Sequence, residues 1–291
     1  MAFPKKLQFK TPAKINLGLH IHKKREDGFH ELETILQMVT WFDELQLEGT
    51  CEKVELFCDT PEIPNDETNL VVKAARLLQK HFPGRCAGVN ITLKKSIPSG
   101  AGLGGGSGNA AGTIQALNHL YRRSSETEGL LSRETILAIA SELGSDVPFF
   151  LEPSPCEIKG RGENINPLLG FPKLFLIIIK PPLSISTKEA YKKCLPKTQT
   201  NFPSTPSIDD LKSYFQNHFE TSLLVQFPIL SELKTLLFEN GAFGALVSGS
   251  GSAVFGAYYN KILQNHALKQ ISCLPVGEIF SCETMVNHSY F

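Results

Sequence analysis

The sequence has few of the features that mark secreted, zinc-binding or nucleic-acid-binding proteins. Its seven cysteines are odd in number, and no two of them have Cys-x-x-Cys spacing. This pattern argues against a disulfide framework or a zinc site and favours reduced thiols, as in the cytoplasm. Lysine plus arginine and aspartate plus glutamate both number 29. No overall basic charge is therefore available to hold nucleic acid or an anionic membrane.

Long hydrophobic runs are also missing. The longest, Leu174–Ile179, is far too short to span a bilayer. The N-terminal MAFPKKLQFK has no apolar core of a signal peptide. The 291 residues are nevertheless 42% apolar, which is enough for one large or two ordinary domains with their own cores. We expect a cytoplasmic protein that does not enter membranes, with any anion specificity confined to local sites.

The most informative segment present is Pro98–Gly112, PSGAGLGGGSGNAAG, in which seven of fifteen residues are glycine. An alternating run at 89–94 precedes it, and a helical pattern at 109–120 follows. Glycine permits positive φ and close approach of a ligand to the backbone, while a helix N-terminus presents unpaired N–H groups and partial positive charge. A flexible linker is the alternative, but linkers rarely join a strand to a helix. We expect an anion on residues 102 to 109.

The segment does not match either of the common phosphate motifs. A P-loop closes with Gly-Lys-Ser/Thr, and no lysine follows Gly104 within this loop. Gly100, Gly102 and Gly105 do match GxGxxG. A dinucleotide fold, however, requires a strand with an acidic end about twenty residues later, where this chain has the polar stretch 121–128.

Periodicity predicts an α+β protein of two domains. The Gly-, Pro- and Asn-rich stretch 153–172 suggests a boundary, so we assign residues 1–168 to an N-terminal domain and 169–291 to a C-terminal domain. Predicted strands cover 7–11, 15–21, 33–41, 44–47, 53–58, 89–94, 174–179, 242–247, 253–258 and 277–282. Predicted helices cover 69–81, 109–120, 133–143, 188–194, 208–216, 230–238 and 261–271.

Two clusters offer groups for phosphate chemistry. Lys14 and Asn16 fall on the same face of a predicted strand, which is either solvated or part of a polar cleft. Asp146 lies in the turn Gly144–Pro148, because the preceding helix ends at Gly144 and Pro148 follows. An aspartate in a turn is more often only a turn former.

Two further segments are ambiguous when taken alone. Ser248–Ser252 joins two predicted strands, so it is either a hairpin tip or a second anion-binding nest. Asp27–His30 combines a turn with an aromatic ring and an imidazole, suitable for stacking on a base. Its alternative is an ordinary hairpin turn with a core phenylalanine.

These segments, in this order, resemble the GHMP kinases, which include galactokinase, homoserine kinase, mevalonate kinase and phosphomevalonate kinase. The resemblance spans nearly the whole chain. PAKIN (residues 12–16) and DGFHE (27–31) with GSDVP (144–148) are most similar to the branch that acts on a cytidine diphosphate-linked methylerythritol in the non-mevalonate isoprenoid pathway. The resemblance implies a ribosomal protein S5 domain 2-like N-terminal domain and a ferredoxin-like C-terminal domain. It also implies transfer of the γ-phosphoryl group of ATP to the 2-hydroxyl of that substrate.

The resemblance further assigns roles to residues of this chain. Lys14 matches the active-site lysine and Asp146 the catalytic aspartate. The resemblance implies that Mg²⁺ is bound by the ATP phosphates, and it assigns no protein residue as a metal ligand. The ATP-binding positions are Pro98, Gly100, Gly102, Leu103, Gly104, Gly105, Gly106, Ser107, Gly108 and Asn109, with Asn69 and Lys95 near the adenosine. The substrate-binding positions are Asn16, Phe29, His30, Tyr191, Gly249 and Ser250.

Two positions depart from the family pattern. Phe29 stands where the family has tyrosine, and Gly108 stands where it usually has a second serine. A mevalonate or homoserine kinase is the alternative within the superfamily, but neither would account for the DGFH segment. A non-catalytic relative is the alternative outside enzymes, and the retained Lys14 and Asp146 argue against it. We expect a small-molecule kinase that is a monomer or a weak homodimer.

Overall fold

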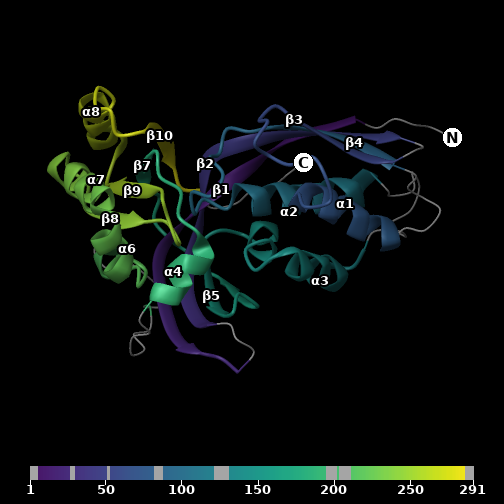
Figure 1. Ribbon diagram of the computed structural model, residues 1–291, viewed down its shortest axis with the longest axis horizontal. Helices are drawn as coiled ribbons and strands as arrows, with labels where there is room; N and C mark the ends of the chain where they lie inside the picture. Colours follow the sequence, from purple (N-terminus) through teal and green to yellow (C-terminus); the bar gives the residue numbers. More distant parts are fainter. Residues whose placement is uncertain are drawn as a thin grey trace.

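Two β-sheets with helices packed on them form the molecule (Figure 1). The computed structural model describes residues 6–26, 30–50, 53–81, 88–120, 131–194, 202 and 211–285. The first sheet has six strands and the second has four. The prediction of a two-domain α+β fold is confirmed.

The first sheet is built around two long antiparallel strands, β1 (Lys6–Lys24) and β2 (His30–Thr50). One end of β2 pairs with β4 (Gly88–Lys94) and the other end with β5 (Cys156–Gly160). β3 (Val54–Cys58) runs parallel to β4, and β6 (Asn164–Pro167) completes a hairpin with β5. The chain segments that bear Lys14 and His30 therefore lie on adjacent strands.

The two long strands replace four predicted shorter ones. In β1 the register against β2 shifts between Pro12 and Ala13 and again between Asn16 and Gly18. Each shift interrupts the alternation of apolar residues, because an irregularity turns the following side chains to the other face. The sequence pattern therefore suggested that the strands end at points where they only bulge.

Helices α1 (Leu70–His81) and α2 (Gly105–Leu120) pack against this sheet, and α3 (Arg133–Leu143) packs on α1 and α2 (Figure 1). α3 has the predicted bounds, since Ser132 Oγ accepts from Thr135 N at 3.2 Å and the Gly144 N–H donates to Ala140 O at 3.2 Å. α2 begins four residues earlier than predicted. Glycines at its start have low intrinsic helix propensity, so the pattern alone assigned them to the loop.

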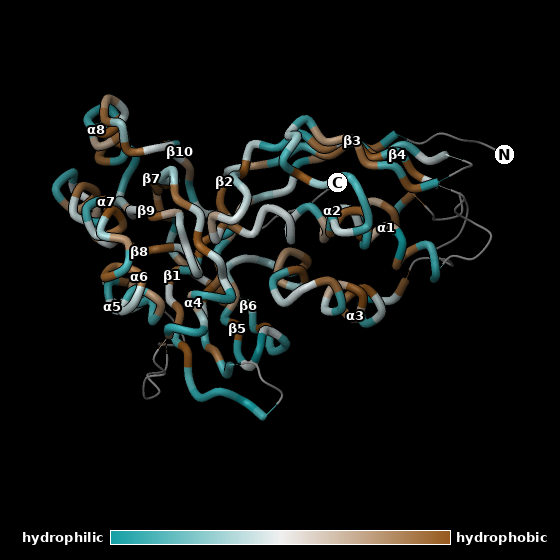
Figure 2. The backbone as a smooth tube through the Cα atoms, viewed as in Figure 1, coloured by the Kyte–Doolittle hydropathy of each residue, from teal (hydrophilic) through white to brown (hydrophobic). Residues whose placement is uncertain are grey.

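The second sheet is antiparallel in the order β10 (Glu278–Glu283), β7 (Phe175–Lys180), β9 (Val254–Tyr258), β8 (Gly244–Val247). Its helices are α4 (Thr187–Lys193), α5 (Leu211–Tyr214), α6 (Glu220–Gln226), α7 (Pro228–Glu239) and α8 (Lys261–Ile271). In Figure 2 hydrophobic and hydrophilic stretches alternate along α7 and α8, as expected for helices with one face on a core. The sequence pattern did not predict α6. Of the predicted helix 208–216, residues 208–210 lie outside the described part.

A shared apolar cluster joins the two sheets. Trp41 of β2 stacks on Phe280 of β10, with ring centroids 4.2 Å apart and planes 10° apart.

The hairpin β5–β6 was not predicted, because its Gly- and Asn-rich sequence is typical of loops. β6 ends at Pro167 and β7 begins at Phe175. The assignment of the boundary to residue 168 remains a prediction.

No single helix within the described ranges is long and apolar enough to cross a membrane. Only α6 and α7 taken together satisfy that test, by length and composition alone, and they are bent by 106° where they meet.

Candidate active site

Lys14 and Asn16 occupy the buried middle of β1, where they form one polar chain. The backbone N–H of Lys14 donates to Leu103 O at 2.8 Å, and its ammonium donates to Asn16 Oδ1 at 2.8 Å. Asn16 Nδ2 in turn donates to Thr34 Oγ1 at 2.9 Å. The Lys14 side chain is only 6% exposed. The polar-cleft interpretation of this strand face is therefore the correct one.

Asp146 enters the same site from the turn after α3. Val147 N donates to Gly144 O at 3.1 Å, and Pro148 then starts the short 3-10 helix η1 (Pro148–Leu151). Asp146 Oδ2 lies 3.4 Å from Lys14 Nζ, and the Asp146 side chain is 42% exposed. The two predicted catalytic side chains thus meet, with the carboxylate open to the space in front of the lysine.

The glycine-rich loop passes over this pair in a conformation that requires glycine. Gly100, Gly102 and Gly104 have φ of 66°, 77° and 68°. A Cβ at Gly104 would lie 2.8 Å from Lys14 Cγ, and one at Gly102 would overlap Ser248 O. Positive φ and close approach together explain the glycines. The loop leads directly into the first turn of α2, whose N–H groups have no partner within the helix.

The second glycine loop, between β8 and β9, is bonded to the first. Ala253 N donates to Ala101 O at 3.1 Å, and Ser248 Oγ donates to Gly102 O at 2.9 Å. At Gly249, with φ of 57°, a Cβ would lie 3.1 Å from Asn16 Oδ1. Two segments far apart in sequence, joined by a bond between residues 146 positions apart, therefore form one wall beside the Lys14–Asn16 pair.

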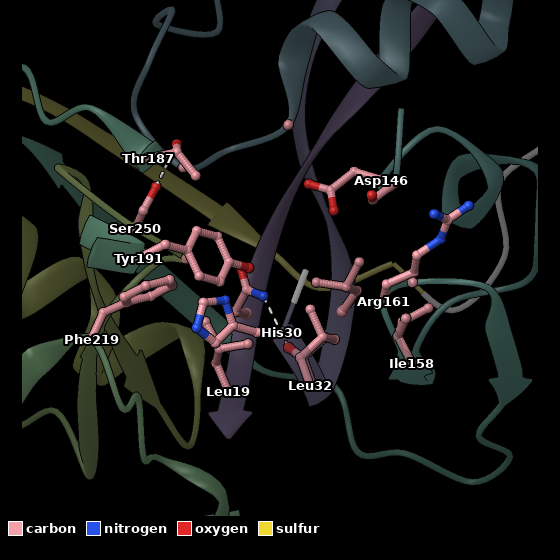
Figure 3. Close-up of a pocket in the computed structure, with 18 of the residues that line it drawn as sticks. Leu19, His30, Leu32, Asp146, Ile158, Arg161, Thr187, Tyr191, Phe219 and Ser250 are labelled. Carbon is pink, nitrogen blue, oxygen red and sulfur yellow. Dashed lines mark hydrogen bonds between the residues drawn. The ribbon is translucent and has the colours of Figure 1, made fainter. Parts of the chain in front are cut away.

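A cavity of about 930 Å³ opens in front of these groups (Figure 3). The helix α4 contributes to its lining, and Ser250 Oγ is 2.8 Å from Thr187 Oγ1 of that helix. Ten of the predicted site residues line it: Lys14, Asn16, His30, Gly102, Gly104, Ser107, Asp146, Tyr191, Gly249 and Ser250.

One end of the cavity is aromatic and apolar. His30 and Tyr191 stack with ring centroids 5.3 Å apart, and Tyr191 meets Phe219 edge-on at 4.9 Å (Figure 3). Burial, and then the negative charge of Asp146, raise the pKa of Tyr191 to about 12. Burial, and then the positive charge of Lys24, lower the pKa of His30. Both rings are therefore held in the neutral form that favours stacking and hydrogen bonding to a base.

Several predicted residues do not line the cavity. Asn109 is buried, with Oδ1 accepting from Thr11 Oγ1 at 2.6 Å, and Asn69 Oδ1 accepts from Val71 N at 2.9 Å at the start of α1. Lys95 forms an ion pair with buried Asp43. Further predicted residues outside the lining are Pro98, Gly100, Leu103, Gly105, Gly106 and Gly108. Phe29 lies outside the described residues, so its role stays a prediction.

Gly108 has a structural reason of its own. A Cβ there would lie 2.8 Å from the backbone oxygen of Pro12 and 3.3 Å from the ring of Phe150. The serine that the family usually has at this position would require the backbone of β1 or α2 to shift. In this chain α2 and β1 are packed too closely for a side chain.

Four basic side chains around the cavity were not predicted from the sequence. Lys188 and Lys192 of α4 line it, as do Arg161 from the β5–β6 turn and Lys24 from β1. With Lys14, the described lining residues thus include five lysines and arginines but one carboxylate, Asp146. The i,i+4 spacing of the two α4 lysines was the available signal. The lining is therefore suited to anionic ligands.

The chain's own residues fit a nucleotide triphosphate. Gly102 and Gly104 leave no room for a side chain near the start of α2, and a Cβ on Gly249 of the second loop would lie 3.6 Å from Lys14 Nζ. Within the described ranges, no group of three or more His, Cys, Asp or Glu side chains is arranged to hold a metal ion.

Together, the two-sheet fold, the glycine loop and the Lys14–Asp146 pair define an ATP-dependent small-molecule kinase of the GHMP type. The model of the GHMP kinases N terminal domain matches residues 69–152, and that of the GHMP kinases C terminal matches residues 203–272.

A relative from Syntrophus aciditrophicus, named 4-diphosphocytidyl-2-C-methyl-D-erythritol kinase, is 40% identical over 260 residues, covering 88% of this chain and 91% of its own length. A crystal structure of a 4-(cytidine 5'-diphospho)-2C-methyl-D-erythritol kinase superposes with a TM-score of 0.81 at 31% identity, covering 97% of this chain and 100% of that one. The chain belongs to the 4-diphosphocytidyl-2-C-methyl-D-erythritol kinase family. A homoserine kinase from Cytophaga hutchinsonii, with a TM-score of 0.72 at 19% identity and coverage of 99% and 96%, shares the fold alone.

Proposed function

We propose that this protein transfers the γ-phosphoryl group of ATP to the 2-hydroxyl of 4-diphosphocytidyl-2-C-methyl-D-erythritol, in the non-mevalonate route to isoprenoid precursors. The observation that supports this best is the position of the Lys14–Asp146 pair. It lies between a glycine cradle suited to phosphates and an aromatic end suited to a base. A kinase for a nucleotide-linked alcohol needs these three parts in one cavity.

The glycine loop and the first turn of α2 would hold the nucleotide phosphates. Backbone N–H groups at a helix N-terminus bind anions, and the positive-φ glycines let those phosphates approach the backbone. Mg²⁺ bound with the nucleotide would supply positive charge that offsets the negative charge developing on the phosphates. Ser107, which lines the cavity, is the hydroxyl nearest in sequence to that first turn.

Asp146 would orient the acceptor. Its carboxylate accepts the hydrogen of the 2-hydroxyl, and as the oxygen–phosphorus bond forms and the bond to the ADP oxygen breaks, the proton passes to Asp146. A loose phosphoryl-transfer transition state requires little deprotonation early, so this transfer comes late. Lys14, fixed by Asn16, holds Asp146 and the acceptor oxygen in register.

His30 and Tyr191 would recognise the cytosine, together with Phe29. A base that enters this end of the cavity meets the flat faces of neutral rings. If Tyr191 and Phe29 supply the stacking faces, His30 would hydrogen-bond to the edge of the base. The cations Arg161, Lys188 and Lys192 make the remainder of the cavity suitable for a diphosphate-linked substrate.

We also propose that the enzyme is cytoplasmic and acts as a monomer or a weak homodimer. The cysteines among the described residues are free thiols at Cys58, Cys156, Cys194, Cys273 and Cys282, as a reducing compartment allows.

A phosphoryl-transfer assay over a panel of acceptors tests the proposal. We expect ADP release with the cytidylylated methylerythritol to exceed that with mevalonate, homoserine and uncytidylylated methylerythritol phosphate by at least about 10³ in kcat/KM, because the site loses both stacking and polar partners without the base. Equal turnover with and without the cytidylyl group would refute base recognition. Preferred turnover of mevalonate or homoserine would assign the chain to another branch of the superfamily.

A further inference from the structure

Asp43, a carboxylate on β2, is bonded to all three residues that lead from β4 into the glycine loop. Its Oδ1 accepts from Ser96 N and Ile97 N, both at 2.8 Å, and its other oxygen forms an ion pair with Lys95. The Asp43 side chain has no exposed surface, and that of Lys95 is 8% exposed. Burying a carboxylate is costly unless hydrogen bonds and an opposite charge compensate. Among the described residues, the hydrogen bonds and the ion pair that compensate Asp43 all come from the segment 95–97.

The segment 95–97 also determines where a positive charge lies. A Cβ on Gly105 would be 3.1 Å from Lys95 Nζ, so the ammonium lies against the first turn of α2. An ammonium at a helix N-terminus is unfavourable, because the helix dipole places partial positive charge there. The carboxylate of Asp43 offsets this repulsion and holds Lys95 beside the loop.

Two other contacts fix the same segment, but each reaches only one residue. Asp59 Oδ1 accepts from Lys95 N at 2.9 Å, and Trp41 Nε1 donates to Ser96 Oγ at 2.9 Å. Trp41 in turn stacks on Phe280 of the second sheet. Asp43 is the contact that joins all three residues and is fully buried.

We propose that Asp43 is a positioning residue for the nucleotide. It fixes the entrance of the glycine loop and holds the Lys95 ammonium at the first turn of α2, and so presents a preformed phosphate cradle. This inference rests on the proposed function, in which ATP is the nucleotide. The acceptor end of the cavity is built on β1, the first part of β2 from His30 to Leu36, the β5–β6 turn and α4, and Asp43 lies further along β2, outside the lining. Asp43 therefore acts on ATP affinity and leaves acceptor recognition unchanged.

The substitution Asp43→Asn tests this directly. Asparagine keeps the size and an oxygen for Ser96 N and Ile97 N, but it places an amide against the Lys95 ammonium. We expect the dissociation constant of MgATP to rise about tenfold or more, which is the scale of losing one charge-assisted hydrogen bond. The KM of the cytidylylated acceptor stays within about twofold, because no acceptor contact is removed.

The binding measurement uses no turnover. Trp41 is the only tryptophan of the chain, and it is bonded to Ser96. Titration of MgATP followed by Trp41 fluorescence, with calorimetry beside it, reports the cradle itself. Glu152→Gln is the matched control, because it neutralises another buried carboxylate, paired with Arg133, outside the cavity lining. It is expected to lower the thermal midpoint without changing ATP affinity.

Asp43→Glu provides a second test if the asparagine variant does not fold. It keeps the charge and moves the oxygens by one methylene, so a loss of ATP affinity of about threefold or more is expected with unchanged acceptor KM. Wild-type ATP affinity in the folded variants would overturn the proposal, as would equal losses for ATP and acceptor. Absence of ATP binding in the wild type would instead refute the proposed function.

Discussion

The substitution Gly104→Ala tests the contact between the glycine loop and Lys14. Gly104 has φ of 68°, a conformation that costs an L-residue about 1–2 kcal/mol. The added Cβ would lie 2.8 Å from Lys14 Cγ and 3.0 Å from the Phe150 ring, whereas carbon atoms at optimal separation are about 3.5–4.0 Å apart. Either the loop or the Lys14 side chain must move by up to about 1 Å.

The magnitudes follow from this geometry. We expect the free energy of unfolding to fall by about 1–3 kcal/mol, from backbone strain together with overpacking. A displacement of about 1 Å at a positioned group costs about 10²-fold in rate, so kcat falls by about that factor. The effect is expected to be largest on kcat because, in the proposed mechanism, Lys14 holds Asp146 and the acceptor oxygen in the transition state.

Gly106→Ala is the control for stability. Its added Cβ would have only Leu70 Cδ1 nearby, at 3.9 Å, and Gly106 does not have positive φ. Alanine in a helix is more favourable than glycine by about 0.5–1 kcal/mol, so this variant should be as stable as the wild type or more so. Thermal unfolding and steady-state kinetics are measured for both. A Gly104→Ala protein with wild-type thermal midpoint and kcat would refute the described contact with Lys14.

Three other outcomes are expected. Asp146→Asn should keep the fold and ATP affinity and lose about 10²–10⁴ in single-turnover rate, the usual contribution of a general base; near-normal turnover would remove its catalytic role. Phe29→Ala should raise the acceptor KM by the loss of about 1–3 kcal/mol of stacking, while Phe29→Tyr is tolerated; equal KM values for the two variants would argue against stacking at this position. The pKa of His30 is lowered, so the folded state favours the neutral imidazole. The contribution of neutral His30 to stability is therefore complete above the ordinary pKa of about 6.5 and is lost as the pH falls below that value. We therefore expect the difference in thermal midpoint between the wild type and His30→Gln to decrease as the pH is lowered from about 8 to about 5. A difference that does not vary with pH would contradict the lowered pKa of His30.

Local sequence patterns were sufficient where local chemistry determines the structure. Ser132 and Gly144 define the ends of α3 through their own hydrogen bonds, and the two-residue spacing of Lys14 and Asn16 places both on one face. The glycine run likewise predicts its own positive-φ turns. In each case the residue that signals the feature is the one that forms it.

Features that depend on distant partners could not be predicted in this way. The long β1 looked like two strands because its register shifts follow from pairing with β2. Nothing around Asp43, between Phe42 and Glu44, distinguishes it from a surface acid. Its burial follows from the segment 95–97, about fifty residues away. The bond between Thr187 and Ser250 joins α4 to the second glycine loop and is equally nonlocal.

The most direct test of the central claim is the position of the new phosphate in the product. The proposed acceptor, the 2-hydroxyl, is on a tertiary carbon that bears no hydrogen. The product formed by wild-type enzyme from ATP and the cytidylylated methylerythritol should therefore show, in proton-coupled ³¹P NMR, a new phosphomonoester signal without three-bond coupling to hydrogen. A monoester signal split by neighbouring protons would mean that another hydroxyl is phosphorylated, and signals of ADP and inorganic phosphate without any new monoester would mean that water is the acceptor. Either result would contradict the proposed function of Asp146 at the 2-hydroxyl.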